Sequence, residues 1–498
     1  MLDFGEIRDV VVLGGGAAGW FAAAEARRLF GPHITVTLVE SPDIGIVGVG
    51  EGGIVNLIDA LKRNGIDPLA FMRETEGAFK LGFAYRGWHG GGDEDVYHHL
   101  FNGPLELADG FDPQMSALLA DGIGVGHAVG SMPLVRRGAS QDEVLQALQA
   151  ENPGFTASLH FDSHRLAEYL HRIATGRGVR HRLAKVQELL LAPETGWVRA
   201  LKLDGGDEIP VGFLIDASGF ARITLGRTYR VPWRSFSEWL LLDRAIPFHM
   251  PHPGPNPALV TNALAMPNGW MWQIPLLKRV GAGYVFSSAH VDDDTALRDI
   301  EQRLGFAVRP MRTLRFEPGH FEQVWRGNVM AVGLASGFVE PLEATSIGQM
   351  LEQLAAFGLV VAGSQGVVSD LAIERFNLAN ADYWRGILDF LRMHYDVRGR
   401  DTPFWRDVAV RPLSPGYAAL KRVWQRRTPR PFDTVPYRMR AQISMFGPPS
   451  WLAVGQGVGA IPPRAARMEL QGLPQQTRRE LAAYVERKRK ESIGDPGA

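Results

Sequence analysis

The chain has 498 residues, enough for a large hydrophobic core, and a formal net charge of −1 that gives no indication of a nucleic-acid or anionic-membrane partner. It contains no cysteine, which excludes disulfides, thiolate metal sites and cysteine nucleophiles, and no metal ion is expected. No uncharged apolar run reaches the roughly 18 residues that a membrane helix needs, and the first predicted strand begins too early to leave room for a signal peptide. These features predict a soluble protein of the cytoplasm.

The first predicted unit is a strand, a tight turn and a helix. The apolar run 10–13, which begins with three β-branched valines, stops at a glycine cluster, and an Ala-rich segment with few helix breakers follows. Gly14 permits the turn, Gly16 lets the backbone approach a pyrophosphate, and Gly19 lets helix and strand pack closely. A second apolar strand over 34–39 ends at the acid expected to meet a ribose hydroxyl. The residues predicted to hold a dinucleotide here are Gly14, Gly16, Ala17, Ala18, Gly19 and Glu40.

Two further turns offer mainly backbone groups, and both follow predicted strands. One begins at Asp216, and the other is the strand-to-helix junction 331–336, which contains Gly333. Together with the first turn they favour a fold that holds one FAD by several strand ends of a single sheet. The glycines of 122–126 lack a preceding strand and a following acid, so an ordinary loop is the better interpretation there. With only one complete fingerprint, the protein is not expected to reduce its own flavin.

The remaining pattern alternates between helices and strands before it becomes mostly helical. Helices are predicted over 54–64, 68–76, 164–174, 347–362, 371–377 and 381–395, and strands over 79–88, 198–203, 208–215, 270–277, 283–288 and 329–333. This order predicts an α/β fold with an FAD-binding, Rossmann-like core of the glutathione-reductase type and mixed sheets. We divide it into a core over 1–360 and a mostly helical C-terminal part over 361–498 that completes the substrate pocket and ends in a charged, solvated helix.

The segment 269–275 reads GWMWQIP and predicts a strand whose two tryptophans, Trp270 and Trp272, face one side. Pro275 ends this strand or lies at its edge. An aromatic pair of this kind usually means core packing. The whole string, however, resembles the WxWxIP motif of the flavin-dependent tryptophan halogenases.

That resemblance extends along nearly the whole chain, in the family's motif order. The matching segments are GxGxxG at 14–19, GVGE at 48–51, FKLG at 79–82, an HFDxH-like stretch at 160–164, DxSGF at 216–220, GYVFSS at 283–288 and SGFxEPLExTxI at 336–347. The resemblance adds four residues to those expected at the cofactor, namely Val49, Gly50, Glu51 and Ile347.

The resemblance implies a halogenase that uses FADH2, supplied by a separate flavin reductase, together with O2 and chloride or bromide. In that family, reduced FAD and O2 give a C4a-hydroperoxide, and halide attack on it gives hypohalous acid. Lys80 would guide this acid to the substrate through a hydrogen bond or as a haloamine, and Glu343 would polarise it and take a proton from the substrate. Backbone N–H groups of Thr345 and Ser346, at a helix N-terminus, would hold the halide.

The resemblance also assigns the walls of two neighbouring sites. The strand 270–275 would keep the substrate away from the flavin, and aromatic side chains would clamp an indole ring by stacking and edge contacts. The wall residues are Trp270, Trp272, Ile274 and Pro275, and the clamp residues are His99, Phe101 and Trp451. Ser346 stands where the family often has glycine, so chloride versus bromide is left open. The ring position attacked and the oligomeric state, a homodimer included, are also open.

Simpler interpretations stay open for the two central side chains and for the protein as a whole. Without the family, Lys80 is interpreted as a surface lysine and Glu343 as its structural ion-pair partner. An aromatic-hydroxylating FAD monooxygenase would share the cofactor half without the lysine, the glutamate or the tryptophan wall. A non-catalytic flavoprotein would have no reason to keep a lysine and a glutamate on segments that face a pocket.

The segment 434–449, just before Trp451, bears on the substrate. Tryptophan halogenases hold the amino and carboxylate groups of free tryptophan with a C-terminal lid rich in tyrosine and glutamate. Here the segment has one tyrosine, no acid and two arginines, so an ammonium group would find no carboxylate, at a cost of about 1–3 kcal/mol. We therefore expect indole or a larger indole-bearing compound as substrate rather than free tryptophan.

Overall fold

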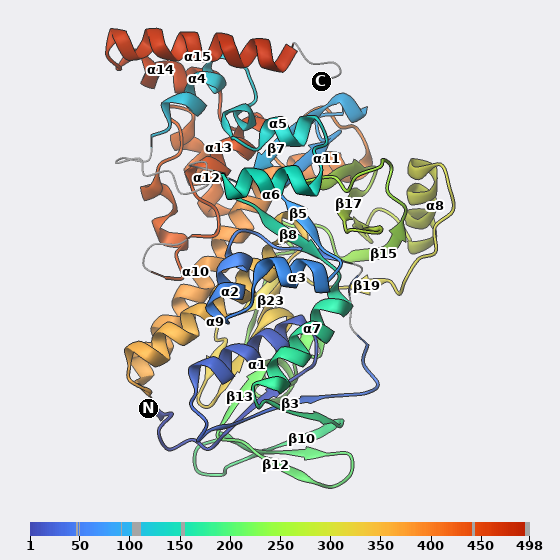
Figure 1. The fold of residues 1–498 in the computed structure, drawn as a ribbon, viewed down its shortest axis with the longest axis vertical. Coiled ribbons are helices and arrows are strands. Elements are labelled where there is room, and N and C mark those ends of the chain that lie inside the picture. Colours follow the sequence, from blue (N-terminus) through green and yellow to red (C-terminus); the bar gives the residue numbers. More distant parts are fainter. Residues whose placement is uncertain are drawn as a thin grey trace.

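The structure, a computed structural model, describes residues 1–45, 48, 50–90, 92–101, 111–150, 155–440 and 444–493. The N-terminal strands lie at one end of its long axis, two long helices cross its middle, and C-terminal helices form the opposite end (Figure 1). The principal helices are α1 (Ala17–Leu29), α2 (Asn56–Arg63), α3 (Pro68–Glu74), α4 (Pro113–Asp121), α5 (Met132–Arg136), α6 (Gln141–Gln149), α7 (Ser163–Gly176), α8 (Asp293–Leu304), α9 (Thr345–Gly363), α10 (Asp370–His394), α11 (Pro403–Val410), α12 (Pro415–Trp424), α13 (Pro448–Gly457), α14 (Pro463–Gln471) and α15 (Gln475–Ile493).

A six-stranded sheet with the order β21-β22-β13-β2-β3-β9 forms the N-terminal end. Its strands span Trp325–Arg326, Val329–Ala331, Phe213–Asp216, Asp9–Leu13, Thr35–Glu40 and Arg180–Leu183, and all neighbours pair in parallel except β21 with β22. From β2 the chain continues to β3 on one side, and β13 lies on the other side. The carboxyl ends of β2 and β13 therefore form the switch point at which sheets of this kind bind ligands. The predicted Rossmann-like core is confirmed.

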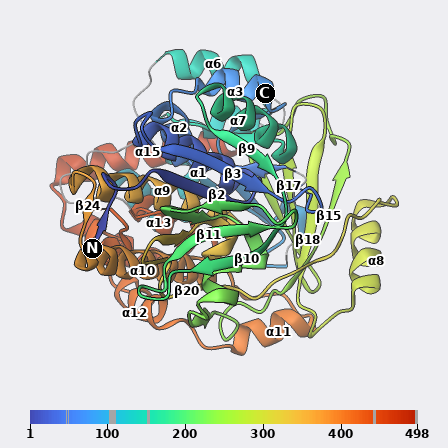
Figure 2. The same ribbon diagram turned by 90° about the horizontal axis from the view of Figure 1, so that it is seen from below.

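Alternate residues of β2 show that different elements pack on the two faces of this sheet. Val10 and Val12 belong to the main core together with buried residues of α1 and α9, whereas Val11 and Leu13 pack against a three-stranded antiparallel sheet. In Figure 2, α1 lies on one side of β2 and β3, and the antiparallel strands lie on the other. These strands are β10 (Val186–Leu191), β11 (Val198–Leu203) and β12 (Glu208–Pro210). This is the arrangement expected of the glutathione-reductase type.

A seven-stranded mixed sheet has the order β19-β15-β18-β17-β16-β6-β7, and a small sheet has the order β4-β8-β5. The seven strands span Leu314–Arg315, Arg244–Met250, Val280–Phe286, Gly269–Pro275, Thr261–Met266, Gly82–Arg86 and Val96–Leu100, and the three strands span Glu51–Gly52, Ser158–Phe161 and Ala78–Lys80. Trp270 and Trp272 of β17 belong to the main core, whereas Met271 packs on the opposite face with Ala296 and Ile300 of α8. The two tryptophans thus face one side, as predicted.

The single strand predicted over 79–88 is wrong, because the segment forms two strands in different sheets. β5 pairs with β8, whereas β6 pairs with β7 and β16. The separation occurs at Gly82, where φ is +147° and a Cβ atom would overlap the His99 carbonyl. Lys80 and the aromatic residues of β6 therefore reach the interior from different sheets.

Two other boundaries also differ from the prediction. The segment 208–215 divides at Gly212, where a Cβ atom would lie 3.0 Å from the Asp9 carbonyl, so β12 stays in the antiparallel sheet and β13 joins β2. The helices predicted over 371–377 and 381–395 are one helix, α10. Asn380, between them, is buried and accepts a hydrogen bond from Gln349 of α9 at 2.8 Å, which favours continuation of the helix.

The C-terminal part is mostly helical, as predicted. Proline stands in the first turn of α11, α12, α13 and α14, where a backbone N–H group would have no hydrogen-bond partner within the helix, so its absence costs nothing. The last helix, α15, is largely exposed but packs on α4 through the buried residues Leu481 and Val485. The division at residue 360 lies inside α9 and stays a prediction.

Helix α9 and the short turn before it form one candidate membrane span among the described residues, but Glu343 and Glu352 interrupt it, so it is not an uncharged apolar run. Residues Leu342–Gly363 are long and apolar enough by length and composition alone. However, 72% of this segment's most apolar window is buried inside the protein. Its buried residues pack with α1, α2 and α10, so the apolar composition reflects a helix at the centre of the core.

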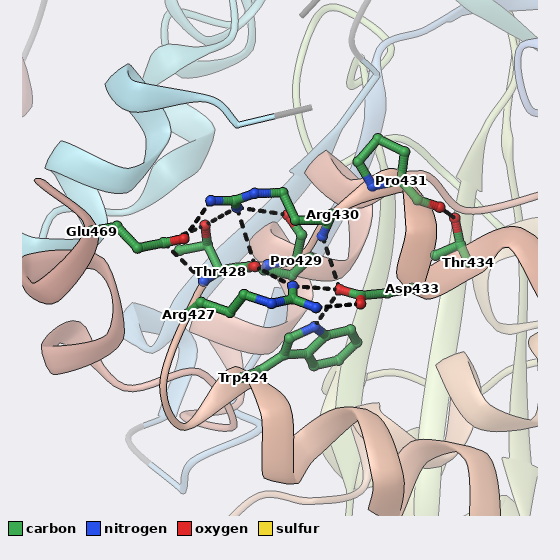
Figure 3. Close-up of polar contacts among 9 residues, drawn as sticks. All are labelled: Trp424, Arg427, Thr428, Pro429, Arg430, Pro431, Asp433, Thr434 and Glu469. Atoms are coloured by element: carbon green, nitrogen blue, oxygen red, sulfur yellow. Dashed lines mark hydrogen bonds and ion pairs between the residues drawn. The ribbon is translucent and has the colours of Figure 1, made fainter. Parts of the chain in front are cut away.

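Figure 3 shows how two partly buried carboxylates, Asp433 and Glu469, hold the chain between α12 and α14 in place. Asp433 accepts hydrogen bonds from both terminal nitrogens of Arg427, at 2.8 and 2.6 Å, and from the Trp424 indole N–H at 3.0 Å. The Arg430 backbone N–H also donates to Asp433, and its guanidinium pairs with Glu469 of α14. This network fixes the start of the segment that leads toward Trp451.

We predict that Gly19→Ala destabilises the cofactor-free protein, because the new Cβ would overlap the Gly14 carbonyl and push α1 away from β2. A shift of this kind in a close-packed contact costs about 1–3 kcal/mol. The matched control is Gly16→Ala, since no protein atom lies within 4 Å of a Cβ built there. Thermal melts of both variants would test this, and equal melting temperatures would contradict it.

Candidate active site

The first glycine turn forms an open cradle at the switch point. Gly14 has φ of +115°, and a Cβ atom there would overlap the Ala217 carbonyl, so the turn from β2 lies directly on the turn from β13. Beside them, the space in front of Gly16 is open, and no side chain caps the N-terminus of α1. Free backbone N–H groups at the positive end of a helix next to open space suit the diphosphate of a dinucleotide.

Glu40 and Asp216, two of the three acids predicted at the cofactor, have different surroundings. The Glu40 carboxylate lies over Gly15, where a Cβ atom would overlap it, and His181 Nε2 lies 2.8 Å from its Oε1. Asp216 uses both oxygens inside its own turn, accepting N–H groups of Ser218 and Thr224 at 2.9 Å each. Asp216 thus shapes the turn that contacts Gly14, and its direct contact with a cofactor stays a prediction. Sequence reasoning missed His181, which is 141 residues from Glu40.

The other residues predicted at the cofactor belong to the same turns, to the glycine-rich segment 48–51 or to helix α9. Val49 lies outside the described residues. Glu51 lies in β4 opposite Phe161, and burial raises the pKa of its carboxyl to about 7. Gly333 leaves room for Ala18, because a Cβ atom at Gly333 would lie 2.7 Å from the Ala18 methyl group. Gly50 lies close to Leu276, because a Cβ atom built at Gly50 would lie 3.2 Å from the Leu276 side chain. Ile347 is buried in α9.

Lys80 is fully buried, so its interpretation as a surface lysine is wrong. Its Nζ lies 3.8 Å from the centre of the Phe83 ring and 5.7 Å from that of Phe101, and it has no hydrogen-bond partner among the described residues. Burial lowers the pKa of its ammonium group to about 7, and the Glu343 carboxylate offsets part of that shift. Near neutral pH, Lys80 is therefore present both as ammonium and as free amine.

Glu343 is buried as well, but it has several partners. Its carboxylate accepts a hydrogen bond from the Tyr85 hydroxyl, and His99 Nδ1 lies 2.8 and 2.9 Å from its two oxygens. His394 Nε2 lies 3.3 Å from Oε1. Burial raises the pKa of Glu343, but His99 and His394 together outweigh it and hold the pKa well below its usual range. Glu343 is thus an ionised carboxylate.

The backbone at Glu343 is unusual, and its ion pairs differ from those predicted. Glu343 and Ala344 have φ of +63° and +54°, in the left-handed region that side chains rarely adopt. No ion pair joins Lys80 and Glu343 in the part of the chain that the structure describes. The groups that contact the Glu343 carboxylate are therefore the two histidines and not Lys80, which acts on the carboxylate only through its charge.

A buried hydrogen-bond network holds the tryptophan wall. The Trp270 indole N–H donates to Glu340 Oε1 at 3.1 Å, and the Tyr395 hydroxyl donates to the same oxygen. Burial raises the pKa of Glu340 to about 7, against the effect of these two hydrogen bonds. The Trp272 ring lies edge-on to Trp270 at 6.4 Å and covers Gly283, where a Cβ atom would overlap it. Ile274 and Pro275 are the last two residues of β17.

The predicted halide residues open helix α9 directly after the left-handed pair. No side chain caps this helix N-terminus, Thr345 is buried, and Ser346 Oγ has no hydrogen-bond partner among the described residues. Uncapped N–H groups at this position can accept an anion. The assignment of halide to Thr345 and Ser346 stays a prediction.

The three predicted clamp residues belong to one aromatic cluster. The Phe83 ring lies between His99, stacked at 6.0 Å, and Phe101, edge-on at 6.1 Å. Trp451 reaches the cluster through Phe390, whose ring centre is 4.8 Å from that of Trp451 and 5.8 Å from that of His99. His99 therefore has two contacts, one with the rings and one with Glu343. The clamp assignment itself stays a prediction.

Several residues of this region were not predicted from the sequence. Glu340 precedes Glu343 by three residues in the same motif, which was a usable signal. Tyr85, His394, Phe390 and Tyr395 carry no comparable local signal, because each joins the site through contacts with residues far away in the chain.

The structure thus combines an open cradle of backbone N–H groups at the switch point with a buried lysine, a buried ionised carboxylate and two core tryptophans on one strand. The tryptophan halogenase family model matches residues 9–472. The chain is 40% identical to y4xG, an uncharacterised protein of Sinorhizobium fredii, covering 98% of this chain and 97% of that one.

Two relatives with assigned activities agree with this match. The chain is 30% identical to the 7-chloro-L-tryptophan 6-halogenase KtzR of Kutzneria, over 96% of both chains. The crystal structure of the tryptophan 6-halogenase SttH from Streptomyces toxytricini has a TM-score of 0.85 at 27% identity, covering 97% of this chain and 96% of that one. The chain belongs to the tryptophan halogenase family, and it is an FAD-dependent halogenase, a class of enzymes that act on aromatic substrates.

The lowered pKa of Lys80 predicts a pH-dependent stability. An unfolded lysine titrates near 10.5 and the folded one near 7, so between these values the unfolded chain binds more protons and this residue's contribution to folding becomes more favourable as pH rises. Lys80→Met removes the titration, so its gain in stability over the wild type should be largest below pH 7. The gain should fall by up to about 1.4 kcal/mol per pH unit between pH 7 and 10.

Denaturant unfolding of both proteins at pH 6, 8 and 9.5 measures this difference. A difference that stays constant over that range would contradict the assigned protonation of Lys80.

Proposed function

We propose that the protein halogenates an indole-type substrate with hypohalous acid that Lys80 receives and directs. The observation that carries this proposal is the buried Lys80 Nζ, which has no hydrogen-bond partner among the described residues and borders the aromatic cluster. An ammonium group there can donate a hydrogen bond to hypohalous acid, and the free amine can form a haloamine. A pKa of about 7 makes both forms available.

Glu343 is proposed to take the proton that leaves the substrate ring. Its carboxylate is ionised, and His99 and Tyr85 hold it in one orientation at the edge of the aromatic cluster. A weakly basic carboxylate can accept a proton from an arenium ion, because that ion is a far stronger acid. His99 and His394 then stabilise the carboxylate when the proton departs.

The proposed cofactor is FAD, held by the cradle of Gly14, Gly16 and Gly19 and by Glu40. The open space at Gly16 and the uncapped N-terminus of α1 fit its diphosphate. When bound in the reduced form, the flavin would supply the two electrons and hydrogens with which O2 oxidises halide to hypohalous acid, the second oxygen atom leaving as water. Trp270, held by Glu340, would keep the substrate out of reach of the flavin. A separate flavin reductase is proposed as the source of FADH2, and the cytoplasm as the location.

The substrate is proposed to be indole or a larger indole compound, although KtzR acts on 7-chloro-L-tryptophan. Arg440 is occupied by Glu352, with contacts of 2.5 and 2.7 Å, and the Tyr437 hydroxyl donates to Asp389 at 2.5 Å. Both polar side chains thus have partners within the protein. Among the described residues of 434–449 there is no carboxylate for an amino group.

The direct test is mass spectrometry of indole after incubation with the enzyme, FAD, a flavin reductase, NADH and either halide. A halogen isotope pattern supports the proposal. A gain of one oxygen would indicate a hydroxylase, and an unchanged substrate a flavoprotein without this activity. Without the reductase, product should be negligible, and robust turnover in its absence would contradict the proposed partner.

We predict that Lys80→Ala abolishes halogenation and leaves FAD binding intact, because the lysine side chain contacts the Phe83 and Phe101 rings and not the cradle. Glu343→Gln should lower turnover by about 10²-fold, the usual effect of losing a positioned proton acceptor. Product formation is measured with catalase present, and Lys278→Ala, which changes an exposed lysine, is the control. Near-wild-type halogenation by Lys80→Ala would disprove the role of the lysine.

For the substrate, we predict a higher kcat/KM for indole than for L-tryptophan under a matched reductase supply. The reason is the unpaired ammonium of tryptophan, which costs about 1–3 kcal/mol when no acceptor is present. A tenfold or greater preference for tryptophan would contradict this prediction, since it would require an amino-acid anchor among the residues of the site.

A further inference from the structure

Phe446 lies inside the aromatic cluster that contains the predicted clamp. Its ring stacks face to face on Phe390, with ring centres 3.7 Å apart and planes at 11°, and the residue is only 5% exposed. His99 lies 6.4 Å from the Phe446 ring, and Trp451 stands edge-on to Phe390 at 4.8 Å. Phe446 therefore shares its neighbours with any ring that His99 and Trp451 would clamp.

Hydrogen bonds to its own backbone hold Phe446 in this position. The Trp451 indole N–H donates to the Phe446 carbonyl at 3.2 Å, and the Ser444 hydroxyl donates to the same carbonyl at 3.1 Å. The cavity next to it has a volume of about 10 Å³ and is lined in part by Tyr437 and Met445. That volume corresponds to a single water molecule and is too small for an indole ring.

We infer that Phe446 occupies the position of the substrate's aromatic ring and has to move out before the substrate can bind. This inference rests on the proposed function, because it takes His99 and Trp451 as the clamp. Phe446 is then a specificity-determining residue that competes with the substrate from within the same chain. Rings that stack better than phenyl on Phe390, as the larger indole does, displace it most readily.

The competition lowers the apparent affinity without changing the clamp. If the form with Phe446 displaced makes up only a tenth of the molecules, the observed Kd is about tenfold higher than that of the open form. Truncation of Phe446 removes the competing ring and should lower the observed Kd by the same factor. If Phe446 were instead a permanent wall that stacks on the bound substrate, the same truncation would weaken binding. The two roles therefore predict changes of opposite sign in the Kd.

The test is isothermal titration of indole into the full-length protein saturated with oxidised FAD, in which no turnover takes place. Phe446→Ala should lower the Kd for indole by about tenfold, and Phe446→Trp should raise it. Phe432→Ala is the matched control, because Phe432 lies in the same C-terminal part, is 85% exposed and should leave the Kd unchanged.

Phe446→Leu covers the case in which the alanine variant does not fold, since leucine keeps a buried apolar side chain but cannot stack as a ring. It should also bind indole more tightly than the wild type. Unchanged, weaker or undetectable binding in folded Phe446→Ala or Phe446→Leu would overturn the inference. Tighter binding of indole without any halogenated product would support the inference and contradict the proposed halogenation. The two results can therefore be told apart.

Discussion

The buried charge of Glu343 is the constraint on which the rest of the site depends. A buried carboxylate costs several kcal/mol unless partners compensate for it. Its partners are Tyr85 of β6, His99 of β7 and His394 at the end of α10. One carboxylate therefore ties the seven-stranded sheet and the C-terminal helices together beside the first turn of α9, and a shift of either part would leave the charge uncompensated.

Lys80 and Glu343 are buried charges of opposite kinds. Glu343 has partners that keep it ionised, and its left-handed backbone, which costs about 1–3 kcal/mol, turns the carboxylate toward the sheet just before α9 begins. Lys80 has no hydrogen-bond partner in the described part of the chain, and burial brings its pKa to about 7. The pKa values of both groups are lowered, by different causes, which suits a site that needs an ionised acid and a partly neutral amine at the same pH.

The sequence predicted what depends on local pattern. The glycine turn, the orientation of Trp270 and Trp272 and the helical C-terminal part follow from residue type and spacing over a few turns or strands. It did not predict the end of β5 before Gly82, since that depends on how closely the strand carrying His99 approaches. Nor did it predict the partners of Glu343, because Tyr85 is 258 residues away and His99 is 244 residues away. Contacts of that range follow only from the assembled sheets.

The C-terminal part gives a physical reason for recognition by rings. Arg427 is paired with Asp433, Arg440 with Glu352 and Tyr437 with Asp389, so these polar groups satisfy one another within the protein. A buried charge that is already paired gains little from a ligand and loses its partner if it turns toward one. What remains beside Glu343 is the stack of Phe390 and Phe446 with Trp451 at its edge. Such a surface distinguishes ligands by the size and stacking of their rings, and its own phenyl group closes it when no ligand is bound.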